Sequence, residues 1–565
     1  MIGPSRFWQI LLILAIFAVL GWPALSTAWQ AAIDVRADFV RPASPAEEAE
    51  RDTPSGRYLG ARPLSLAWNT IKFVGLTLLI AMTPGVALAW LLFRTDLFGR
   101  RLLLAILGLA LFVPMPLHAL AWIGSFGNAG RSQALGWGPV IAGLPGAAFV
   151  HAMAALPWVV FIAGVGLRTV EPELEESARM DLSAWQVAVR ITLRRSLGAI
   201  VGAALAVTVL TAGDMTVTDL LSVRTYAEEA YIQAQLTNGQ GAAAAIAAGP
   251  MLVVLGGLIL WAARTLVRAD PARLPSAHRH ARTWSLGRWR IPLGVIVLLT
   301  VGNLFAMPVY GLIWRSGRVG SAIGSGLGPR WSLPGFIGSL RQAWPDLIAP
   351  RERGPWYATL ETRPLLATLF WSSLAASLVV SLAWPLAWLC RERGPWRLVA
   401  SLSAALALAT PGPIVGEALK RAYLKIPIIY DTPALLVIAY VARTLPYALL
   451  VLWPAVRAIP REHLDAAMLD GLNAWGRFRK VGLPLTLGAI AAAWGVAFVL
   501  AIGELPASYF AANPGREPVA FEVWRLLHNG VESHLASVGL LLLAGVGFAG
   551  AMAMVAVSRV YRVRD

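Results

Sequence analysis

Two acidic residues stand at equivalent places in long apolar stretches of this 565-residue chain. Asp214 and Glu504 each follow a glycine, and they lie 290 positions apart. A carboxylate inside a membrane-spanning segment is costly, so it is a candidate for function by default. We expect both acids to line the outer part of a transmembrane pathway and to favour a cation. The competing interpretation is a helix-end acid that holds a neighbouring loop in place.

Other groups capable of chemistry are few and scattered. His118, His151 and Glu417 lie near the ends of apolar stretches, but no metal-ligand spacing links their imidazole and carboxylate groups. We interpret them as interface residues with satisfied hydrogen bonds. The single cysteine, Cys390, leaves no internal disulfide and no CxxC motif. Because we also find no nucleophile–base pair, we predict no metal site, no catalytic residues and no enzymatic activity.

Apolar segments long enough to cross a bilayer must position the two acids. Hydrophobic residues make up 57% of the chain and charged residues only 14%, whereas soluble domains carry about 25% charged residues. A helix needs roughly 20 apolar residues to cross the hydrocarbon core. We therefore predict an all-α integral membrane protein of about twelve transmembrane helices. The predicted spans are 7–29, 66–92, 102–123, 140–167, 198–218, 243–263, 291–313, 366–389, 398–418, 433–456, 487–507 and 536–557.

Basic residues cluster in alternate gaps between these predicted spans. Because cytoplasmic loops of membrane proteins are rich in Arg and Lys, we place these gaps and both termini in the cytoplasm. Segments 30–65 and 314–365 are then external loops, and the first apolar run is a retained helix instead of a signal peptide. The net charge of +17 arises from these separate clusters, so we expect no nucleic-acid partner.

The chain repeats itself with an offset of 290 residues. Residues 174–200 and 464–490 share Leu-x-Ala-Trp and the ending Leu-Gly-Ala-Ile, and each follows the fourth predicted span of its half. Six spans per half give both halves one orientation, so we predict two tandem parallel repeats. We assign the first half to 1–270, a cytoplasmic linker to 271–290 and the second half to 291–565.

Prolines also recur between the halves. Pro114 and Pro116 of the first half match Pro411 and Pro413 of the second. Proline removes a backbone donor and interrupts helices, so we expect a helix break at each pair and a hinge there.

The repeated segments have the periodicity of amphipathic helices, because apolar residues recur every three or four positions in both copies. One interpretation is a loop helix packed on its own bundle. The other is a helix that docks into a groove of a soluble partner. We predict docking for both copies, at about 171–195 and about 461–485.

The second copy resembles the coupling-loop signature of bacterial ABC importer permeases, which have MetI-like transmembrane domains. That signature contains an acid-Ala-Ala triplet, a glycine four residues later and an apolar-x-Leu-Pro ending. The resemblance implies that this segment docks into an ATP-hydrolysing subunit, and the glycine is expected to permit a sharp turn. The matching residues are Asp465, Ala466, Ala467, Gly471, Leu483 and Pro484.

The first copy departs from this signature. An aspartate replaces the glycine, and Arg194 replaces the proline. We expect a different turn and weaker coupling, although the position and the apolar stripe still predict docking. The residues of the first copy assigned to coupling are Glu175, Glu176, Ser177, Ala178 and Asp181.

The fused two-copy layout is similar to the ferric-iron permeases, a group that also resembles thiamine and polyamine permeases. Residues 503–508, Gly-Glu-Leu-Pro-Ala-Ser, are similar to the iron-type branch. The resemblance implies an inner-membrane permease for ferric iron that works by alternating access, with thiamine or polyamine as alternative substrates. It also implies a periplasmic solute-binding protein as a partner, with membrane lipid around the spans.

ATP hydrolysis is expected outside this chain. None of the four lysines follows a glycine, so the P-loop pattern GxxxxGK[ST] is absent. An ATP-driven importer would therefore need a separate ABC ATPase, expected in two copies and using ATP with Mg²⁺, while this chain binds no cofactor. A secondary, ion-coupled transporter is the alternative from another class, and segment 96–101 is faintly similar to the major-facilitator loop. A third alternative is a structural membrane scaffold without transport.

Overall fold

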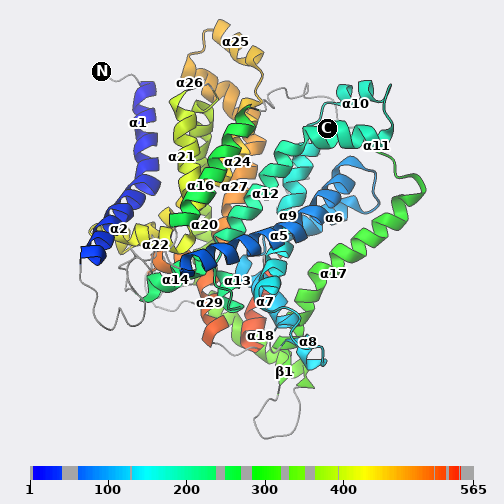
Figure 1. Cartoon of the computed structure of the whole chain (residues 1–565), viewed down its shortest axis with the longest axis vertical. Helices are drawn as coiled ribbons and strands as arrows, with labels where there is room; N and C mark the ends of the chain where they lie inside the picture. The colour runs from blue at the N-terminus through cyan, green and yellow to red at the C-terminus, as the bar shows by residue number, and fades with distance from the viewer. Residues whose placement is uncertain are drawn as a thin grey trace.

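The computed structural model of this chain is almost entirely helical (Figure 1). It describes residues 4–40, 61–127, 130–236, 249–268, 283–319, 330–349, 363–391, 394–513, 516–529, 533–545 and 547–548. Within these residues, seven helices are long and apolar enough to cross a membrane, and up to ten if each sharply bent pair counts as one span. The chain is therefore an all-α, multi-pass membrane protein. The twelve helices and the tandem repeat remain predictions.

The first half contains three long membrane helices, two sharply bent pairs and several short helices. Two π-helical segments, η1 (Phe17–Gly21) and η2 (Ala188–Leu193), interrupt its helices. The α-helices are α1 (Pro4–Ile16), α2 (Trp22–Val40), α5 (Ala61–Arg94), α6 (Arg100–Ala110), α7 (Met115–Phe126), α8 (Arg131–Ala134), α9 (Gly143–Arg168), α10 (Pro172–Ala178), α11 (Ala184–Val187), α12 (Leu197–Ala212), α13 (Thr216–Leu220), α14 (Tyr226–Leu236) and α16 (Gly249–Arg268).

The second half follows a similar order of elements. Its π-helical segment is η4 (Phe478–Gly482), and a 3-10 turn, η3 (Gly287–Trp289), leads into its first helix. The α-helices are α17 (Arg290–Ser316), α18 (Leu333–Ile348), α20 (Pro364–Leu389), α21 (Pro395–Ala409), α22 (Gly412–Tyr423), α23 (Pro427–Tyr430), α24 (Ala434–Arg457), α25 (Arg461–Leu469), α26 (Ala474–Arg477), α27 (Leu483–Ile502), α28 (Ser508–Ala511) and α29 (Val519–Asn529), followed by a short apolar helix, Ser533–Gly545.

One small antiparallel strand pair, β1 (Arg318–Val319) and β2 (Arg330–Trp331), lies in the predicted external loop 314–365, with Arg318 opposite Trp331. Several predicted segments are described only in part, the external loops 30–65 and 314–365 among them. Span 243–263 is described from Gly249 and span 536–557 as far as Phe548, and residues 269–282 of the linker region lie outside the described residues.

Two predicted spans are sharply bent at their paired prolines. Helices α6 and α7 meet at 104°, and α21 and α22 meet at 109°. Pro114 and Pro411 are the residues that precede α7 and α22, and both have extended backbone conformations. Pro116 and Pro413 lie in the first turn, where a helix has no partner for the backbone N–H. Proline therefore ends one helix and begins the next at both places.

Each half has a core of three tightly packed long helices. In the first half, Phe73, Val159 and Val207 of α5, α9 and α12 are buried in one apolar cluster. In the second half, Val379 and Tyr440 of α20 and α24 are buried together with alanines of α27. Small residues along these helices allow the backbones to approach closely, which is how membrane helices associate.

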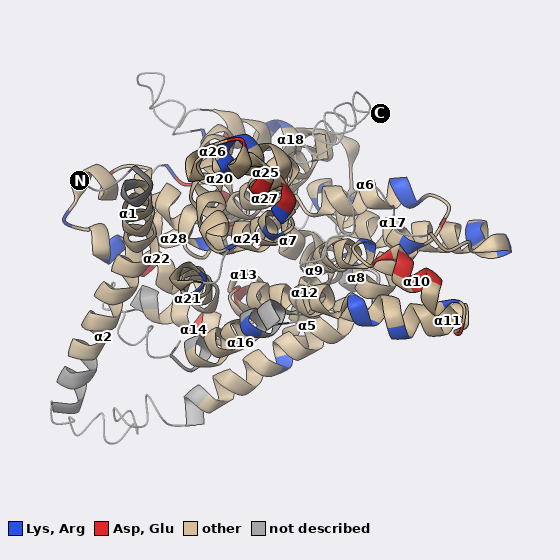
Figure 2. Ribbon diagram, turned by 90° about the horizontal axis from the view of Figure 1, so that it is seen from above, with Lys and Arg blue, Asp and Glu red and all other residues tan. Residues whose placement is uncertain are grey.

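The first helix of each half packs against the other half. In the second-half core, α1 and η1 contribute Leu12, Ile16 and Leu20. The Tyr423 hydroxyl donates a hydrogen bond to the Ala18 carbonyl at 2.6 Å. Reciprocally, Val297 and Val301 of α17 are buried among α6 and α9 of the first half. Figure 2 shows α1 and α17 on opposite sides of the molecule. The two halves are therefore interlocked.

Candidate coupling and pathway sites

The two repeated amphipathic segments lie at the same end of the helical bundle (Figure 1). Helices α10 and α11 follow α9, and α25 and α26 follow α24 at the equivalent place. We call this end, defined by α10, α11, α25 and α26, the coupling face. Charged residues, blue and red in Figure 2, lie on these helices, whereas the long spans are mostly uncharged. The end that carries α18 and β1 is called the opposite face.

The two segments fold alike at their caps and π-helical turns, but the first then bends by 59° into α12, whereas Ala474–Ile502 continues as one helix. Ser183 caps α11 by accepting a hydrogen bond from the backbone N–H of Gln186, and Asn473, 290 positions later, caps α26 by accepting one from Gly476. A π-helical segment follows each cap. Residues 191–200 and 481–490 have the same pattern of burial at every position. These equivalences support the predicted repeat.

The second coupling segment exposes part of its triplet. Asp465 and Ala466 are exposed, whereas Ala467 is buried against the bundle. Gly471 has a φ of +81°, a backbone conformation that glycine adopts without steric cost. The Gly471 N–H bonds to the Met468 carbonyl, and the following N–H bonds to the Ala467 carbonyl, both at 3.0 Å. This pair of bonds is a Schellman motif, which ends the helix and reverses the chain.

Two more residues of this signature lie where α27 begins. Leu483 is half-buried and Pro484 is exposed, and both belong to the first turn of the helix. Pro484 has no N–H to donate, and it directly follows the π-helical turn in which the Leu483 N–H bonds to the Phe478 carbonyl.

The first coupling segment turns differently, as the aspartate predicts. Ser222 is the one non-glycine residue with a positive φ among those the structure describes, so Asp181 does not adopt the conformation of Gly471. The Leu182 N–H instead bonds to the Ala178 carbonyl at 2.9 Å. Glu176, Ser177 and Asp181 are exposed, and Ala178 is half-buried.

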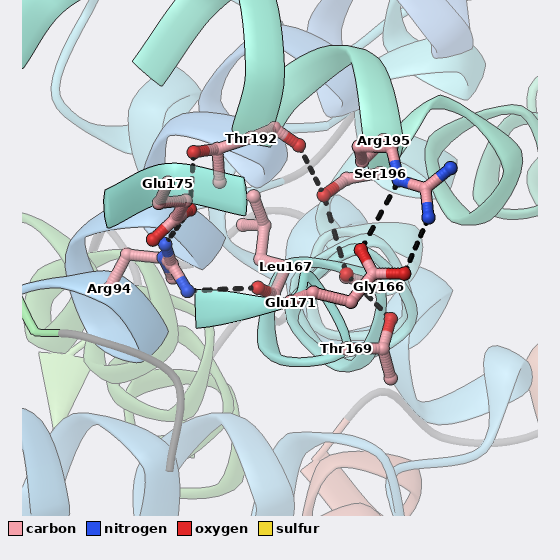
Figure 3. Close-up of polar contacts among 9 residues, drawn as sticks. All are labelled: Arg94, Gly166, Leu167, Thr169, Glu171, Glu175, Thr192, Arg195 and Ser196. Carbon is pink, nitrogen blue, oxygen red and sulfur yellow. Dashed lines mark hydrogen bonds and ion pairs between the residues drawn. The ribbon is translucent and has the colours of Figure 1, made fainter. Parts of the chain in front are cut away.

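Glu175 is the predicted coupling residue whose position is least expected. Its side chain is buried, and its carboxylate forms an ion pair with Arg94, the last residue of α5 (Figure 3). Thr192 donates a second hydrogen bond to Glu175 Oε1 at 2.5 Å, and Arg94 also donates to the Leu167 carbonyl at 3.3 Å. Glu175 therefore joins α10 to its own bundle, whereas its counterpart Asp465 faces outward.

Further polar contacts hold the first coupling segment. Arg195 Nη2 lies 2.5 Å from Glu171 Oε1, just before α10 (Figure 3). The Ser196 hydroxyl donates to the Thr192 carbonyl at 2.8 Å and to the Gly166 carbonyl at 3.3 Å. The segment from α10 to α12 is thus fastened to the end of α9.

Aromatic side chains hold the second coupling segment. The rings of Trp384 and Phe478 have centroids 4.0 Å apart, and the Phe478 ring also contacts Trp388 and Trp475. Trp384 donates its indole N–H to the Thr486 hydroxyl at 2.9 Å. Equivalent segments are therefore anchored by ionic contacts in one half and by aromatic contacts in the other.

Large apolar side chains are exposed on both coupling segments. Trp185 is 76% exposed. If this face lies in water, as the sequence predicts, such exposed apolar side chains mark an interaction surface. Much of the surface of each side chain is left uncovered by the bundle, although Trp475 also stacks on Phe478 and Trp8. The exposed set comprises Leu174, Met180 and Trp185 in the first segment and Met468, Leu469 and Trp475 in the second.

A cavity of about 150 Å³ lies between the halves, and both predicted pathway acids line it. Asp214 and Glu504 stand directly after α12 and α27. The first half also contributes His118 and His151, and the second contributes Arg443 and Tyr447. Among the residues described, no group of three or more His, Cys, Asp or Glu side chains is arranged to hold a metal ion.

Each acid also holds the backbone that follows it. Asp214 Oδ2 accepts from the Val217 N–H at 3.1 Å, at the start of α13, and lies 3.1 Å from His151 Nε2. Glu504 accepts from the N–H groups of Ala507 and Ser508 at 2.9 and 2.8 Å, at the start of α28. The acids line a shared cavity, as the pathway interpretation requires. Each also secures the loop that follows it, as the interpretation as a helix-end acid requires.

The hinge prolines lie beside these acid-bearing loops. A Cβ added to Gly503 would lie 3.2 Å from Pro114 Cβ of the other half, and one added to Gly412 would lie 2.3 Å from Pro506 Cβ. The bends of α6–α7 and α21–α22 are therefore close to the cavity. Their action as hinges remains a proposal.

Several functional candidates were not identified as site residues from the sequence. Arg443 stands inside predicted span 433–456, and its Nε lies 3.8 Å from Glu504 Oε1. An intramembrane arginine is itself a signal of function, so it could have been identified. Arg94 could not have been identified in this way. It lies at the end of a predicted span, where arginine is common simply because cytoplasmic loops are rich in basic residues.

The fold and the two sites define the class: a polytopic membrane protein with a cavity between interlocked halves and paired amphipathic helices at one face. Residues 364–563 match the family described as the binding-protein-dependent transport system inner membrane component. This part of the chain is therefore similar to the ABC permease domains of that family.

Individual relatives match over shorter stretches. The putrescine transport system permease protein PotI of Escherichia coli K12 is 28% identical over 130 residues, which cover 23% of this chain and 46% of PotI. The spermidine/putrescine transport system permease protein PotC of the same organism is 24% identical over 108 residues, covering 19% and 41%. The alpha-glucoside transport system permease protein AglF of Rhizobium meliloti is 38% identical over 56 residues, covering 10% and 17%. The chain spans less than half the length of these relatives.

Proposed function

We propose that this chain is the permease subunit of a binding-protein-dependent ABC importer. The observation that carries the proposal is the pair of equivalent, outwardly apolar coupling segments at one face of the bundle. A secondary transporter would need no such pair. The family match over residues 364–563 supports the same conclusion for the second half.

The coupling face would lie in the cytoplasm and bind two copies of a separate ABC ATPase that uses ATP with Mg²⁺. Trp8 of α1 stacks on Trp475 of α26 with ring centroids 6.5 Å apart, which supports a cytoplasmic N-terminus. A periplasmic solute-binding protein would deliver the substrate at the opposite face. ATP binding would draw the coupling helices together and rock one half against the other.

The central cavity would be the permeation pathway. Met215 and Leu505, the residues after the two acids, are fully buried in one cluster with Trp524. In this cluster, side chains of both halves pack against each other between the cavity and α29. For a substrate to enter from the opposite face, these side chains would have to separate, which is the movement that alternating access requires.

For the substrate, we propose a cation, because two carboxylates line the cavity. Ferric iron is suggested by the resemblance of residues 503–508 to the iron-type branch. The printed names of two relatives favour polyamines instead, and none of the three relatives is named for iron.

Reconstitution in liposomes tests the function and the substrate together. The chain would be combined with its ATPase and solute-binding protein and challenged with Fe(III), putrescine, spermidine or thiamine. We expect one of these to stimulate ATP hydrolysis and uptake. Uptake driven by a proton gradient without the ATPase would identify a secondary transporter. Failure of all substrates to stimulate hydrolysis would favour a scaffold.

A further inference from the structure

A buried ion pair joins the first coupling helix to the membrane bundle. The side chains of Arg94 and Glu175 are 0% and 1% exposed, and they come from positions 81 residues apart. Arg94 Nε and Glu175 Oε2 have no hydrogen-bond partner among the described residues. The two buried charges are therefore compensated chiefly by one another, with support from Thr192 and the Leu167 carbonyl.

The segment that leads into the second half is attached at the same corner. The Trp284 N–H donates to the Arg94 carbonyl at 2.7 Å, and the Asp96 N–H donates to the Trp284 carbonyl at 3.2 Å. The Arg179 guanidinium, next to α10, lies 4.5 Å from the centre of the Trp284 ring. Three elements meet here: the end of α5, the first coupling helix and the linker segment that leads into α17.

The equivalent corner of the second half is built differently. Asp465, which corresponds to Glu175, is exposed on the coupling face. Aromatic contacts of Trp384, Trp388 and Phe478 hold that segment. In the second half, the acid of the coupling triplet is exposed and can contact a partner protein. In the first half, the equivalent acid is buried and pairs with an arginine of the same chain.

We propose that Arg94 and Glu175 are positioning residues that clamp the first coupling helix to α5 and, through Trp284, to the second half. This inference rests on the proposed importer function. A push on α10 by the ATPase then moves α5 and the entry to α17 together, because the three elements form one rigid joint. The ATPase meets the first coupling segment through its exposed apolar side chains and the second segment also through Asp465.

The test compares neutral substitutions at equivalent positions in the reconstituted complex. Glu175→Gln alone leaves the Arg94 charge buried without its partner, which is strongly destabilising. The double variant Arg94→Gln/Glu175→Gln removes both charges together. We expect it to bind the ATPase normally and to hydrolyse ATP, while uptake per ATP falls about fivefold.

Asp465→Asn should give the opposite result. Its affinity for the ATPase should fall about tenfold, because a charged contact with the partner is lost, whereas uptake per ATP at saturating ATPase stays unchanged. Glu171→Gln is the matched control in the first segment, since it removes a more exposed ion pair with Arg195. It should change neither quantity by more than about twofold.

Two outcomes would overturn the clamp. One is normal uptake per ATP in the double variant, and the other is a loss of ATPase affinity equal to that of Asp465→Asn, which would mean that Glu175 faces the partner. If the double variant does not accumulate in the membrane, Arg94→Lys serves instead, since it keeps the charge and loses the forked donor. It should lower uptake per ATP, and an unchanged ratio would again overturn the clamp. If the unmodified complex shows no substrate-stimulated hydrolysis, the importer function itself fails.

Discussion

Gly471 ends α25 in a left-handed backbone conformation, with φ at +81°. A Cβ there would meet no atom within 4 Å, so the cost of Gly471→Ala is conformational and not steric. That cost is about 1–2 kcal/mol. We expect the turn to loosen, with lower ATP-driven uptake although the protein still inserts. Gly471→Pro should be more severe, because proline cannot adopt this φ and removes the N–H that bonds to Met468.

Gly488 provides the matched control for Gly471. It lies within α27, and a Cβ there also has open space. Gly488→Ala should therefore leave uptake unchanged and raise helix stability slightly, by about 0.5–1 kcal/mol. Equal uptake in Gly471→Ala, Gly471→Pro and Gly488→Ala would contradict the role given to the turn.

His528 of α29 should make one contact between the halves sensitive to pH. Its Nε2 lies 3.0 Å from Asp219 Oδ2 of α13, and this hydrogen bond raises the pKa of His528 above its usual value. Since the folded-state pKa is raised, the stabilisation is complete below about pH 6.5 and is lost as the pH rises through the raised value. The partly exposed pair contributes less than about 1 kcal/mol.

Thermal unfolding between pH 5.5 and 8.5 tests this contact. The unmodified protein should lose stability as the pH rises, and His528→Gln should lose less over the same interval. His463→Gln, at an exposed position on α25, controls for the removal of a histidine elsewhere. A pH dependence that persists in full without His528 would show that another group is responsible.

The sequence indicated which residues belong to the sites better than it indicated their burial and their contacts. The offset of 290 residues predicted that Asp214 and Glu504 lie near each other between the halves, and both line one cavity. Their role in a pathway stays a prediction. The burial of Glu175 could not be predicted, because its partner Arg94 is distant in sequence and an acid on an amphipathic helix ordinarily faces water. Which acid is buried depends on tertiary contacts that local periodicity does not contain.

At the scale of elements, the exposed tryptophan of the first coupling segment is the clearest test of docking. Tryptophan is common among residues that dominate binding energy, and truncation of such a residue costs about 2 kcal/mol or more. Trp185→Ala should therefore weaken binding of the ATPase about thirtyfold. Because the side chain is 76% exposed, the stability of the permease itself should change little. Titration of the ATPase against the purified permease measures the affinity.

Trp137→Ala is the control for Trp185→Ala. Trp137 is 72% exposed, and its backbone N–H bonds to the Ser132 carbonyl of α8, a helix that lies toward the opposite face (Figure 1). Its replacement should leave affinity for the ATPase unchanged. If the two variants lose affinity equally, or if neither does, the first coupling segment does not dock through this side chain.

The positions of helices followed from the sequence better than their partners did. Apolar runs marked most spans, and the prolines marked the breaks at 104° and 109°. The packing of α1 on the second half and of α17 on the first was not predicted. Hydrophobic periodicity shows that a helix has a buried face, but nearly uniform apolar surfaces do not show which neighbour covers it.

At the scale of the whole molecule, the carboxylates of Asp214 and Glu504 have two structural roles at once. Each carboxylate secures a loop from one half and faces a cavity built by both halves. The loop of the second half also lies against Pro114 of the first half, where α6 and α7 bend. A movement of one half against the other would therefore move the acids and the bend together. Opening of the cavity would then also change the positions of the two carboxylates that line it.

The double variant Asp214→Asn/Glu504→Gln separates the charge from the loop contacts. Asparagine keeps an oxygen that can accept from Val217, and glutamine keeps one that can accept from Ala507. The Ser508 N–H loses its carboxylate acceptor, but the Ser508 hydroxyl still donates to the backbone carbonyl of residue 504, so the loops should remain in place. We expect folded protein, normal ATPase binding and a loss of cation uptake of about tenfold or more, because two pathway charges are gone. Uptake of the identified substrate into liposomes, normalised to inserted protein, gives the result.

Glu417→Gln is the control for this pair, because Glu417 is as buried as Glu504 at 7% exposed. It forms an ion pair with Arg421 and does not belong to the cavity lining. Its replacement removes a buried charge without changing the pathway, so uptake per inserted molecule should be kept. If the double variant transports as well as Glu417→Gln does, Asp214 and Glu504 serve the loops alone and the cavity does not select by charge.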